Sequence, residues 1–250
     1  MIEWQSQAII LGTKRFGENK LIVSLLTEEH GVVNGIMRQT KASRLQGTTQ
    51  LGNRVHIHWK ARLEEHLGYL SLDLVESLAG RLISNHAKLL CLSTATCLTL
   101  GVFPERHPYP GIYQEISTLL ESLKQDDWKE SYVHFEHRVL QEMGFALKLE
   151  ECCISGSTEE LAYVSPKTGR AVTKEHGAPY HEKLLALPAF LLEKEKTAES
   201  FQDLAQGFHL MGYFFQTHMM EHAYGKFMRV RGQLLTALEK TMQEETRTNA

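Results

Sequence analysis

Two adjacent cysteines, Cys152 and Cys153, resemble half of a metal site. A structural zinc ion takes four tetrahedral ligands, and its thiolates usually come as two Cys-x-x-Cys pairs. A pair that began at Cys152 would place its second member at Ser155, which is not a zinc ligand in such sites. The following forty residues contain His176 and His181 but no cysteine. We therefore expect two reduced thiols near a packed surface and no metal.

Two histidine pairs also have spacings that could chelate a metal ion. His56 and His58 alternate along one predicted strand and share its face, whereas His218 and His222 stand one helical turn apart. The second pair lacks the glutamate of a His-Glu-x-x-His motif, because Met219 occupies that position. A metal-dependent hydrolase or nuclease that uses these pairs stays open as an alternative function.

Other catalytic patterns are missing from the sequence. The glycines of "LGTKRFGENK" do not match a phosphate-binding loop, and a Gly-x-Ser-x-Gly motif is absent. The acidic pairs fall in predicted turns and first turns of helices, where solvated carboxylates are expected. We therefore expect a protein that is not an enzyme and that needs no cofactor.

Basic residues gather in the first quarter of the chain, although the net charge of the whole is −3. Residues 1–62 hold nine basic and four acidic side chains, a balance of +5, and the remainder has a balance of −8. Such asymmetry favours a basic module that binds a phosphate backbone. The expected nucleic-acid contacts are the cations on predicted turns and strands: Lys14, Arg15, Arg38, Lys41, Arg44, Arg54, Lys60 and Arg62.

Planar side chains near these cations could stack on bases. Phe16 lies in the first predicted turn, and His56 and His58 lie on the polar face of a predicted strand. Trp59 belongs to the apolar alternation of that strand and is expected in the core. Because phosphate contacts would dominate, we expect weak sequence preference and strong salt dependence.

The first eighty residues show the two-residue period of half-buried strands. The period is clearest in 54–61 and 69–75, and three earlier apolar runs at 8–11, 21–26 and 32–37 are separated by turn-forming residues. Five short strands with glycine-rich connections predict an OB-type β-barrel, with an SH3-like barrel as the alternative.

From about residue 82 the apolar spacing becomes helical. Helices are predicted near 85–102, 111–123, 126–145 and 204–219, with Ser84 or Asn85 as the N-cap of the first. The period is lost between these last two helices, where "AYVS" and "RAVT" flank a turn and predict a short β-hairpin insert.

The expected fold is therefore α+β, with a five-stranded barrel followed by a helical bundle. We place the DNA-binding barrel at 1–80 and the helical domain at 81–250, with the cysteine-bearing insert at 147–187. No apolar run is long enough to span a bilayer, and no signal peptide is evident. Four irregularly spaced cysteines do not form a disulfide framework, so we expect a cytoplasmic protein.

Several stretches resemble the RecO family of bacterial recombination mediators and DNA repair proteins. They are "AIILGTKRFGENKLIVSLLTEEHGVVNGIMR", the following "SRLQ" and "GN", and the helical "PYPGIYQEISTLLESL" and "FEHRVLQEMGF". The resemblance covers roughly residues 4 to 225, and "AYVSPKTGRAV" with "GAPY" looks like the alphaproteobacterial form.

The resemblance implies an OB-fold domain, a helical body and a function without enzymatic turnover. RecO proteins bind single- and double-stranded DNA, anneal complementary strands, contact the C-terminal tail of single-stranded-DNA-binding protein and, with RecR, help load RecA. A nucleoid-associated cytoplasmic protein is thereby implied. The family's DNA contacts would fall first on Arg38 and Arg44. Further contacts would fall on Lys14, Arg15, Lys41 and Arg54.

Two further expectations follow from this resemblance. Many family members carry a zinc-binding four-cysteine insert. Here "CCISG" leaves Cys152 at the first position of a Cys-x-x-Cys pair, with Ser155 at the second and no further pair. We therefore expect a metal-free hairpin with a remnant cysteine. An apolar groove between helices, near a basic group such as Arg138, would accept the acidic and hydrophobic tail of single-stranded-DNA-binding protein.

Overall fold

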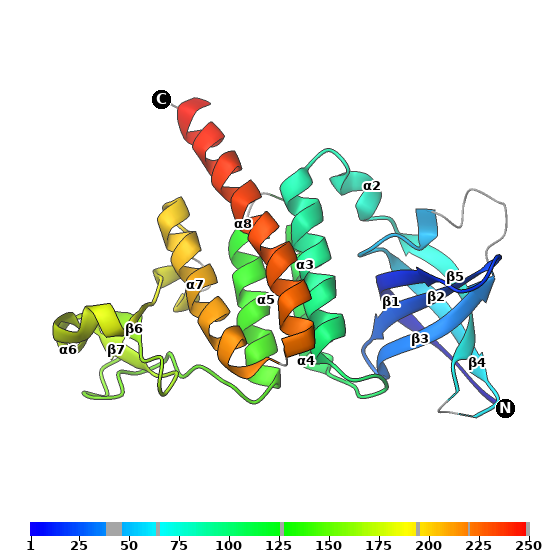
Figure 1. Ribbon diagram of the computed structural model, residues 1–250, viewed down its shortest axis with the longest axis horizontal. Coiled ribbons are helices and arrows are strands. Elements are labelled where there is room, and N and C mark those ends of the chain that lie inside the picture. The colour runs from blue at the N-terminus through cyan, green and yellow to red at the C-terminus, as the bar shows by residue number, and fades with distance from the viewer. Residues whose placement is uncertain (39–46, 64–65, 126–127, 194–195, 220, 249–250) are drawn as a thin grey trace. The chain divides into compact units, whose positions relative to one another are not determined.

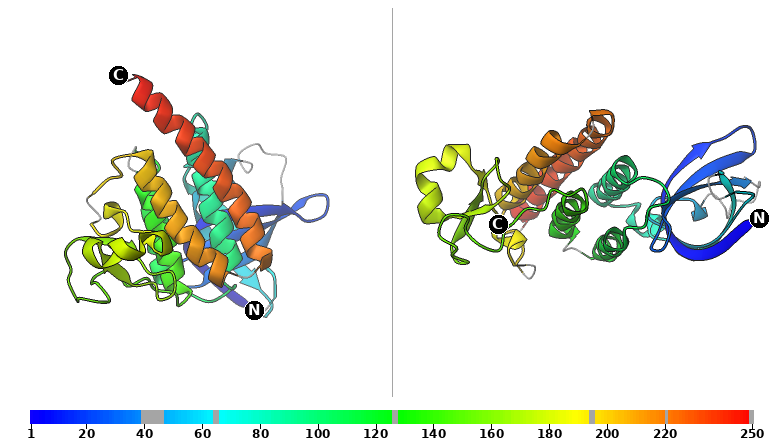
Figure 2. Two further views of the ribbon diagram at one scale, coloured as in Figure 1. Left: turned by 60° about the vertical axis from the view of Figure 1, so that its left-hand side comes forward. Right: turned by 90° about the horizontal axis from the view of Figure 1, so that it is seen from below.

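The structure is a computed structural model with two compact units, Met1–Lys124 and Gln125–Ala250. It describes the following parts of the chain: residues 1–38, 47–63, 66–125, 128–193, 196–219 and 221–248. Figure 1 shows the elements of both units, and Figure 2 shows the same ribbon from two further directions. Among the described residues, no helix has the length and apolar character needed to cross a membrane.

Five strands at the start of the chain form a closed barrel in the order β1-β2-β3-β5-β4 (Figure 1). They are β1 (Ile2–Arg15), β2 (Lys20–Thr27), β3 (Gly31–Arg38), β4 (Arg54–Ala61) and β5 (Gly68–Glu76). Antiparallel β1–β4 pairing and a short parallel contact between β3 and β5 close the ring. This small Greek-key ring confirms the predicted five-stranded OB-type barrel and the α+β class.

Alternate side chains of the strands fill the barrel. The β1 strand is long, and a register shift between Ile10 and Gly12 lets it pair with β4 along its first part and β2 along its second. Trp59 is 3% exposed, so its predicted place in the core is confirmed. The core consists of Ala8, Ile10, Val23, Leu25, Val33, Met37, Val55, Ile57, Trp59, Ala61, Leu70 and Leu72.

Three helices follow the barrel within the first unit. They are α2 (Ala79–Leu82), α3 (His86–Val102) and α4 (Pro110–Ser122). Asn85 caps α3 as predicted, because its side-chain oxygen accepts the Lys88 N–H at 3.0 Å. The close approach of Leu92 on α3 to Gly52 packs this helix against the barrel.

Three long helices make up most of the second unit: α5 (Trp128–Glu142), α7 (Phe201–His218) and α8 (Glu221–Thr248). A capping box between Ser200 and Asp203 starts α7. In the core, the Arg231 guanidinium donates two 2.7 Å hydrogen bonds to the buried Glu136 carboxylate, whose Oε1 also accepts from the Tyr132 hydroxyl. This buried pair joins α5 to α8.

The insert between α5 and α7 contains a small three-stranded sheet in the order β7-β6-β8. Its elements are β6 (Leu161–Val164), β7 (Ala171–Thr173), α6 (Lys174–Gly177), the 3₁₀ turn η1 (Ala178–Lys183), β8 (Leu185–Ala186) and the 3₁₀ turn η2 (Ala189–Leu191). The sheet contains the predicted hairpin as β6 and β7, and β8 adds a third strand. The compact units divide after Lys124, and the expected domain boundary near residue 80 stays a prediction.

Candidate nucleic-acid interface

Four cations lie at one end of the barrel, where β1 and β3 end and β2 begins. Lys14 and Arg15 are the last residues of β1, Lys20 is the first of β2, and Arg38 is the last of β3. We call these four residues the basic end. The first two and Arg38 are exposed, and Lys20 is half-buried. Three of the four were expected from the sequence, and Lys20 was not.

The turn between β1 and β2 places an aromatic residue beside the basic end. The Phe16 N–H donates to the Lys20 carbonyl at 2.9 Å, and Gly17 adopts a left-handed φ of 72° that favours glycine. The Phe16 side chain is 46% exposed. A planar apolar ring therefore stands beside the cations, in a position suited to stacking on a base.

Strand register places two like charges opposite each other. Lys20 on β2 and Arg38 on β3 are direct cross-strand partners. Like charges at such positions are destabilising unless something neutralises them. Within the described part of the chain, no carboxylate forms an ion pair with either residue. The pair therefore forms a concentrated positive potential that a phosphate group would relieve.

The remaining expected cations occupy different settings. Lys41 and Arg44 lie outside the described residues, in the connection that follows Arg38. Arg62 is exposed immediately after β4. The other two, Arg54 and Lys60, lie on β4 and are held by acidic partners.

Arg54 links the barrel to α4. Its guanidinium lies 3.7 Å from the Glu76 carboxylate and 3.3 Å from that of Glu121, and it donates to both the hydroxyl and the carbonyl of Ser117. Lys124 lies 2.6 Å from Glu121, and its hydrogen bond is the main cause that lowers the pKa of that carboxyl. The Arg54 guanidinium is therefore already paired with carboxylates of the fold.

Lys60 and His58 share one carboxylate at the start of β1. Glu3 lies 3.3 Å from the Lys60 ammonium and 2.7 Å from His58 Nε2. The hydrogen bond from Lys60, followed by that from His58, lowers the pKa of Glu3. The carboxylate therefore offsets part of the positive charge on this side of the barrel.

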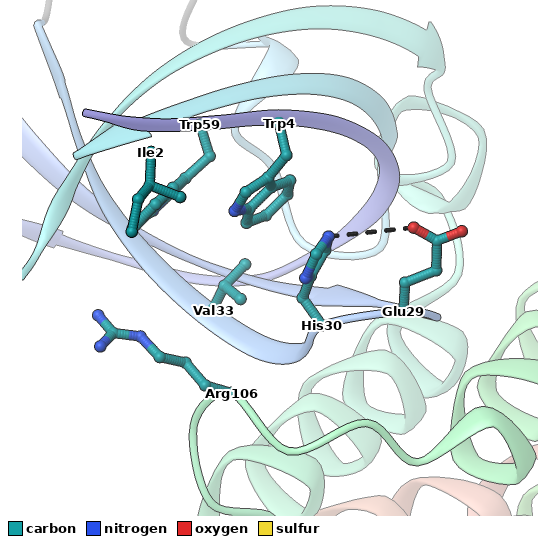
Figure 3. Close-up of a pocket in the computed structure, with 7 residues that line it drawn as sticks. All are labelled: Ile2, Trp4, Glu29, His30, Val33, Trp59 and Arg106. Carbon is teal, nitrogen blue, oxygen red and sulfur yellow. Dashed lines mark ion pairs between the residues drawn. The ribbon is translucent and has the colours of Figure 1, made fainter. Parts of the chain in front are cut away.

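A pocket of about 400 Å³ lies elsewhere on the first unit, and Figure 3 shows its lining. Its walls come from β1, the β2–β3 turn, β3, β4 and the segment after α3: Ile2, Trp4, Glu29, His30, Val33, Trp59 and Arg106. Sequence reasoning missed this site, because its residues are scattered over a hundred positions without a local motif. The alternation along β1 could have indicated only that Trp4 faces inward.

Two of the histidines that could have supported the alternative metal site make other contacts. His58 contacts Glu3, and the His218 ring stacks on Phe145 with ring centroids 3.7 Å apart. The side chain of His222 lies outside the described residues. In the part of the chain that the structure describes, no three His, Cys, Asp or Glu side chains are grouped to hold a metal ion.

The insert places Cys152 at the centre of a hydrogen-bonded cluster. Its sulfur accepts the Thr173 N–H at 3.4 Å and lies 3.7 Å from the Thr173 hydroxyl, which is 2.9 Å from His176 Nδ1. Burial raises the pKa of the Cys152 thiol, but hydrogen bonds from Ser155, Ile154 and Thr173 outweigh it and lower that pKa to about 6.

Four residues of the insert have the spacing of two Cys-x-x-Cys ligand pairs of a zinc site. Cys152 and Ser155 stand three apart, as do Thr173 and His176, although the sequence expectation was that no second pair exists. Ligand atoms of a tetrahedral zinc–sulfur site lie about 3.8 Å apart, close to the separation of the Cys152 sulfur and the Thr173 hydroxyl. Two hydroxyls do not fit a structural zinc ion, so this set of residues does not suit the zinc that the insert of many family members binds.

Arg138 was expected near a groove for a partner peptide. It lies on α5 and forms an ion pair with Glu142, one helical turn later, at 2.6 Å. A pocket of about 390 Å³ in the second unit is lined instead by residues around η2 and the start of α7, including Phe190, Lys196 and Asp203. Partner binding at Arg138 stays a prediction.

Closed five-stranded barrels of this topology form a class of oligonucleotide- and oligosaccharide-binding folds. Comparison with known families narrows the class. Residues 1–78 match the family described as "Recombination protein O N terminal", and residues 84–223 match "Recombination protein O C terminal". The chain therefore belongs to the RecO family.

Curated relatives agree with this assignment. The chain is 40% identical to "DNA repair protein RecO" of Rhodospirillum rubrum, over 88% of this chain and 90% of the relative. It is 39% identical to the protein of the same name from Bartonella quintana, over 96% and 98% of the two chains. The corresponding protein of Chelativorans sp. is 38% identical over 97% and 98%.

Proposed function

We propose that this protein is a mediator of DNA repair and homologous recombination that binds single- and double-stranded DNA through the barrel. It anneals complementary strands and, with RecR, helps load RecA on DNA coated by single-stranded-DNA-binding protein. Membership of a DNA repair family supports the biological role. It acts without a catalytic centre, in the cytoplasm and close to the nucleoid.

The Lys20–Arg38 cross-strand pair, which no carboxylate of the described residues engages, carries the DNA-binding part of the proposal. Anion binding converts the mutual repulsion of these residues into a favourable interaction, and every DNA strand supplies phosphates. Lys14 and Arg15 extend the same positive end, and Lys41 and Arg44 follow Arg38 in the chain. Arg62 adds to this set, whereas Arg54 and Lys60 contribute less because carboxylates already engage them.

A competing hydrolase function finds no comparable support. His58 is held by Glu3, and the His218 ring stacks on Phe145. The described residues also hold no cluster of three side chains suited to a metal ion. The mediator function therefore remains the one that the geometry and the family support best.

Binding of fluorescent single-stranded DNA across a salt series tests the interface. The Lys20→Ala and Arg38→Ala double variant should bind more weakly, and its slope of log affinity against log salt should fall by about 1.4, or 0.7 per lost phosphate contact. Lys196→Ala with Lys240→Ala removes the same charge from the second unit and should leave the slope unchanged. Equal slopes for wild type and the first variant would refute the interface.

Strand annealing tests the activity that follows binding. Wild-type protein should accelerate annealing of complementary oligonucleotides, and the Lys20→Ala and Arg38→Ala variant should lose this acceleration in parallel with its DNA affinity. Acceleration that persists without DNA binding by the barrel would refute the proposed route.

A further inference from the structure

The pocket beside Trp4 is lined by stacked planar rings. The Trp4 and His30 rings are stacked with centroids 3.9 Å apart, and Trp4 and Trp59 are stacked with centroids 5.4 Å apart. Figure 3 shows Trp59 and Trp4 above Val33, His30 beside it and Arg106 below it. A stack of planar rings and a guanidinium group therefore border one hollow.

Close packing fixes the Trp59 part of this wall. Its indole N–H donates to the Asn34 carbonyl at 3.2 Å, which orients the ring. Gly68 on the neighbouring strand leaves the space for the ring, because a Cβ atom there would overlap the Trp59 indole. Trp59 thus supports Trp4 from the core of the barrel before any ligand binds.

The backbone holds Arg106 in an uncommon conformation. Its φ is 62°, a left-handed value that is rare for residues other than glycine, and such strain is concentrated at functional sites. Two hydrogen bonds maintain it: its N–H donates to the Val32 carbonyl at 2.8 Å, and its side chain donates to the His66 carbonyl at 2.9 Å. The strained backbone places the guanidinium at the edge of the pocket (Figure 3).

The chemistry of the lining favours a nucleotide. Because Trp4 is stacked between His30 and Trp59, and Trp59 is buried, the ring open to a base is that of His30, whose side chain is 35% exposed. A planar guanidinium binds phosphate or a base edge. The exposed Glu29 carboxylate, 4.0 Å from His30 Nε2, supplies an acceptor for a base N–H group such as the imide N–H of thymine. A volume of about 400 Å³ is at the small end of the ligand-pocket range and is suited to one nucleotide unit.

We propose that this pocket binds one unstacked nucleobase of single-stranded DNA, with Arg106 contacting its phosphate. This inference rests on the proposed DNA binding by the barrel and adds a second contact to the basic end. The two sites lie at opposite ends of the β2–β3 hairpin, which eight residues of strand extend over about 26 Å. A paired base would first have to leave its duplex, so the pocket favours single strands.

Photocrosslinking of the wild-type protein tests the pocket directly. A single-stranded oligonucleotide that carries 5-iodouracil should crosslink to Trp4 or His30, as mapped by mass spectrometry of the peptides. Crosslinks confined to Phe16 and its neighbours at the basic end would overturn the proposal. This measurement requires no substitution and therefore does not depend on the folding of a variant.

Affinity measurements separate this inference from the proposed function. Arg106→Gln should weaken binding of oligothymidylate about tenfold and leave duplex affinity unchanged, whereas Lys20→Ala with Arg38→Ala should weaken both. If wild-type protein binds neither form, the proposed function fails. If it binds both and Arg106→Gln weakens both equally or neither, the pocket proposal alone fails.

Discussion

The basic end of the barrel and the Cys152 cluster of the insert differ in whether their polar groups have partners within the fold. At the basic end, Lys20 and Arg38 face each other across two strands, and no described carboxylate pairs with them. In the insert, the Cys152 sulfur, the Thr173 hydroxyl and the His176 ring satisfy one another within one small cluster. Both regions attract attention in the sequence, the first by charge and the second by cysteine.

Whether a polar side chain has a partner inside the fold, more than its residue type, distinguishes a ligand-binding group from a structural one. A polar group that its own fold satisfies stabilises that fold, whereas a charge without a partner is available to a ligand. Arg54 extends the comparison into the barrel, because Glu76, Glu121 and Ser117 hold its guanidinium. By this criterion it resembles the insert more than the basic end.

Charge reversal at the basic end should have the largest effect. Lys20→Glu with Arg38→Glu should weaken binding of single-stranded DNA about a hundredfold at low salt, because attraction of phosphates becomes repulsion. Lys20→Glu alone should weaken binding less and raise the free energy of unfolding by about 0.2–1 kcal/mol, since it creates an opposite-charge pair with Arg38.

Fluorescence anisotropy and chemical denaturation measure the two effects of this reversal. Lys240→Glu in the second unit is the matched control for the single change and should alter neither quantity. Loss of stability in the Lys20→Glu variant would show that the like-charge pair is satisfied in solution, and the contrast with the insert would disappear.

Introducing two cysteines into the insert tests whether its four ligand positions lie close enough together to bind a metal ion. Ser155→Cys with Thr173→Cys would join Cys152 and His176 to give three thiolates and one imidazole, a ligand set that zinc accepts. We expect one zinc ion per chain by elemental analysis and a melting temperature that falls on chelation. The same variant with His176→Ala should bind zinc more weakly. Equal metal content in both variants would mean that the two ligand pairs do not meet at one metal ion.

Loss of the Arg54 side chain should affect stability and leave DNA binding nearly unchanged. Arg54→Ala removes hydrogen bonds and ion pairs that join β4 to α4, and we expect the free energy of unfolding to fall by about 1–2 kcal/mol. Thermal melting and DNA affinity at one salt concentration measure the two effects. A strong loss of affinity with full stability would instead place Arg54 among the DNA contacts.

The Cys152 thiol should give an effect that is visible only as a pH dependence of stability. Because its pKa is lowered from 9.0 to about 6 in the folded protein, the unfolded chain binds more protons between these values, and stability rises with pH there. This contribution is complete above pH 9 and is lost as pH falls through about 6. Cys152→Ser should flatten the slope in denaturation series, and Cys153→Ser, the adjacent control, should not.

Local patterns predicted the parts of the fold that depend on neighbours in the sequence. The alternation in β4 gave the correct inward face for Trp59, and Asn85 capped its helix because a cap acts within three residues. The partners of Arg54 could not be predicted, because Glu121 is 67 positions away. The repeated three-residue spacing of Cys152/Ser155 and Thr173/His176 was visible in the sequence but required hydroxyls to be considered at ligand positions.

The segment around Arg106 limits how far the barrel can be treated as a transferable module. Residues 1–78 match one family domain, yet Arg106 belongs to the region that matches the other and pairs with β3 through the Val32 carbonyl. Gly31 must remain glycine there, since a Cβ atom would overlap the His107 carbonyl. A barrel grafted onto another protein without residues 105–108 would therefore leave the pocket without its cation, so exchange between relatives has to move both stretches together.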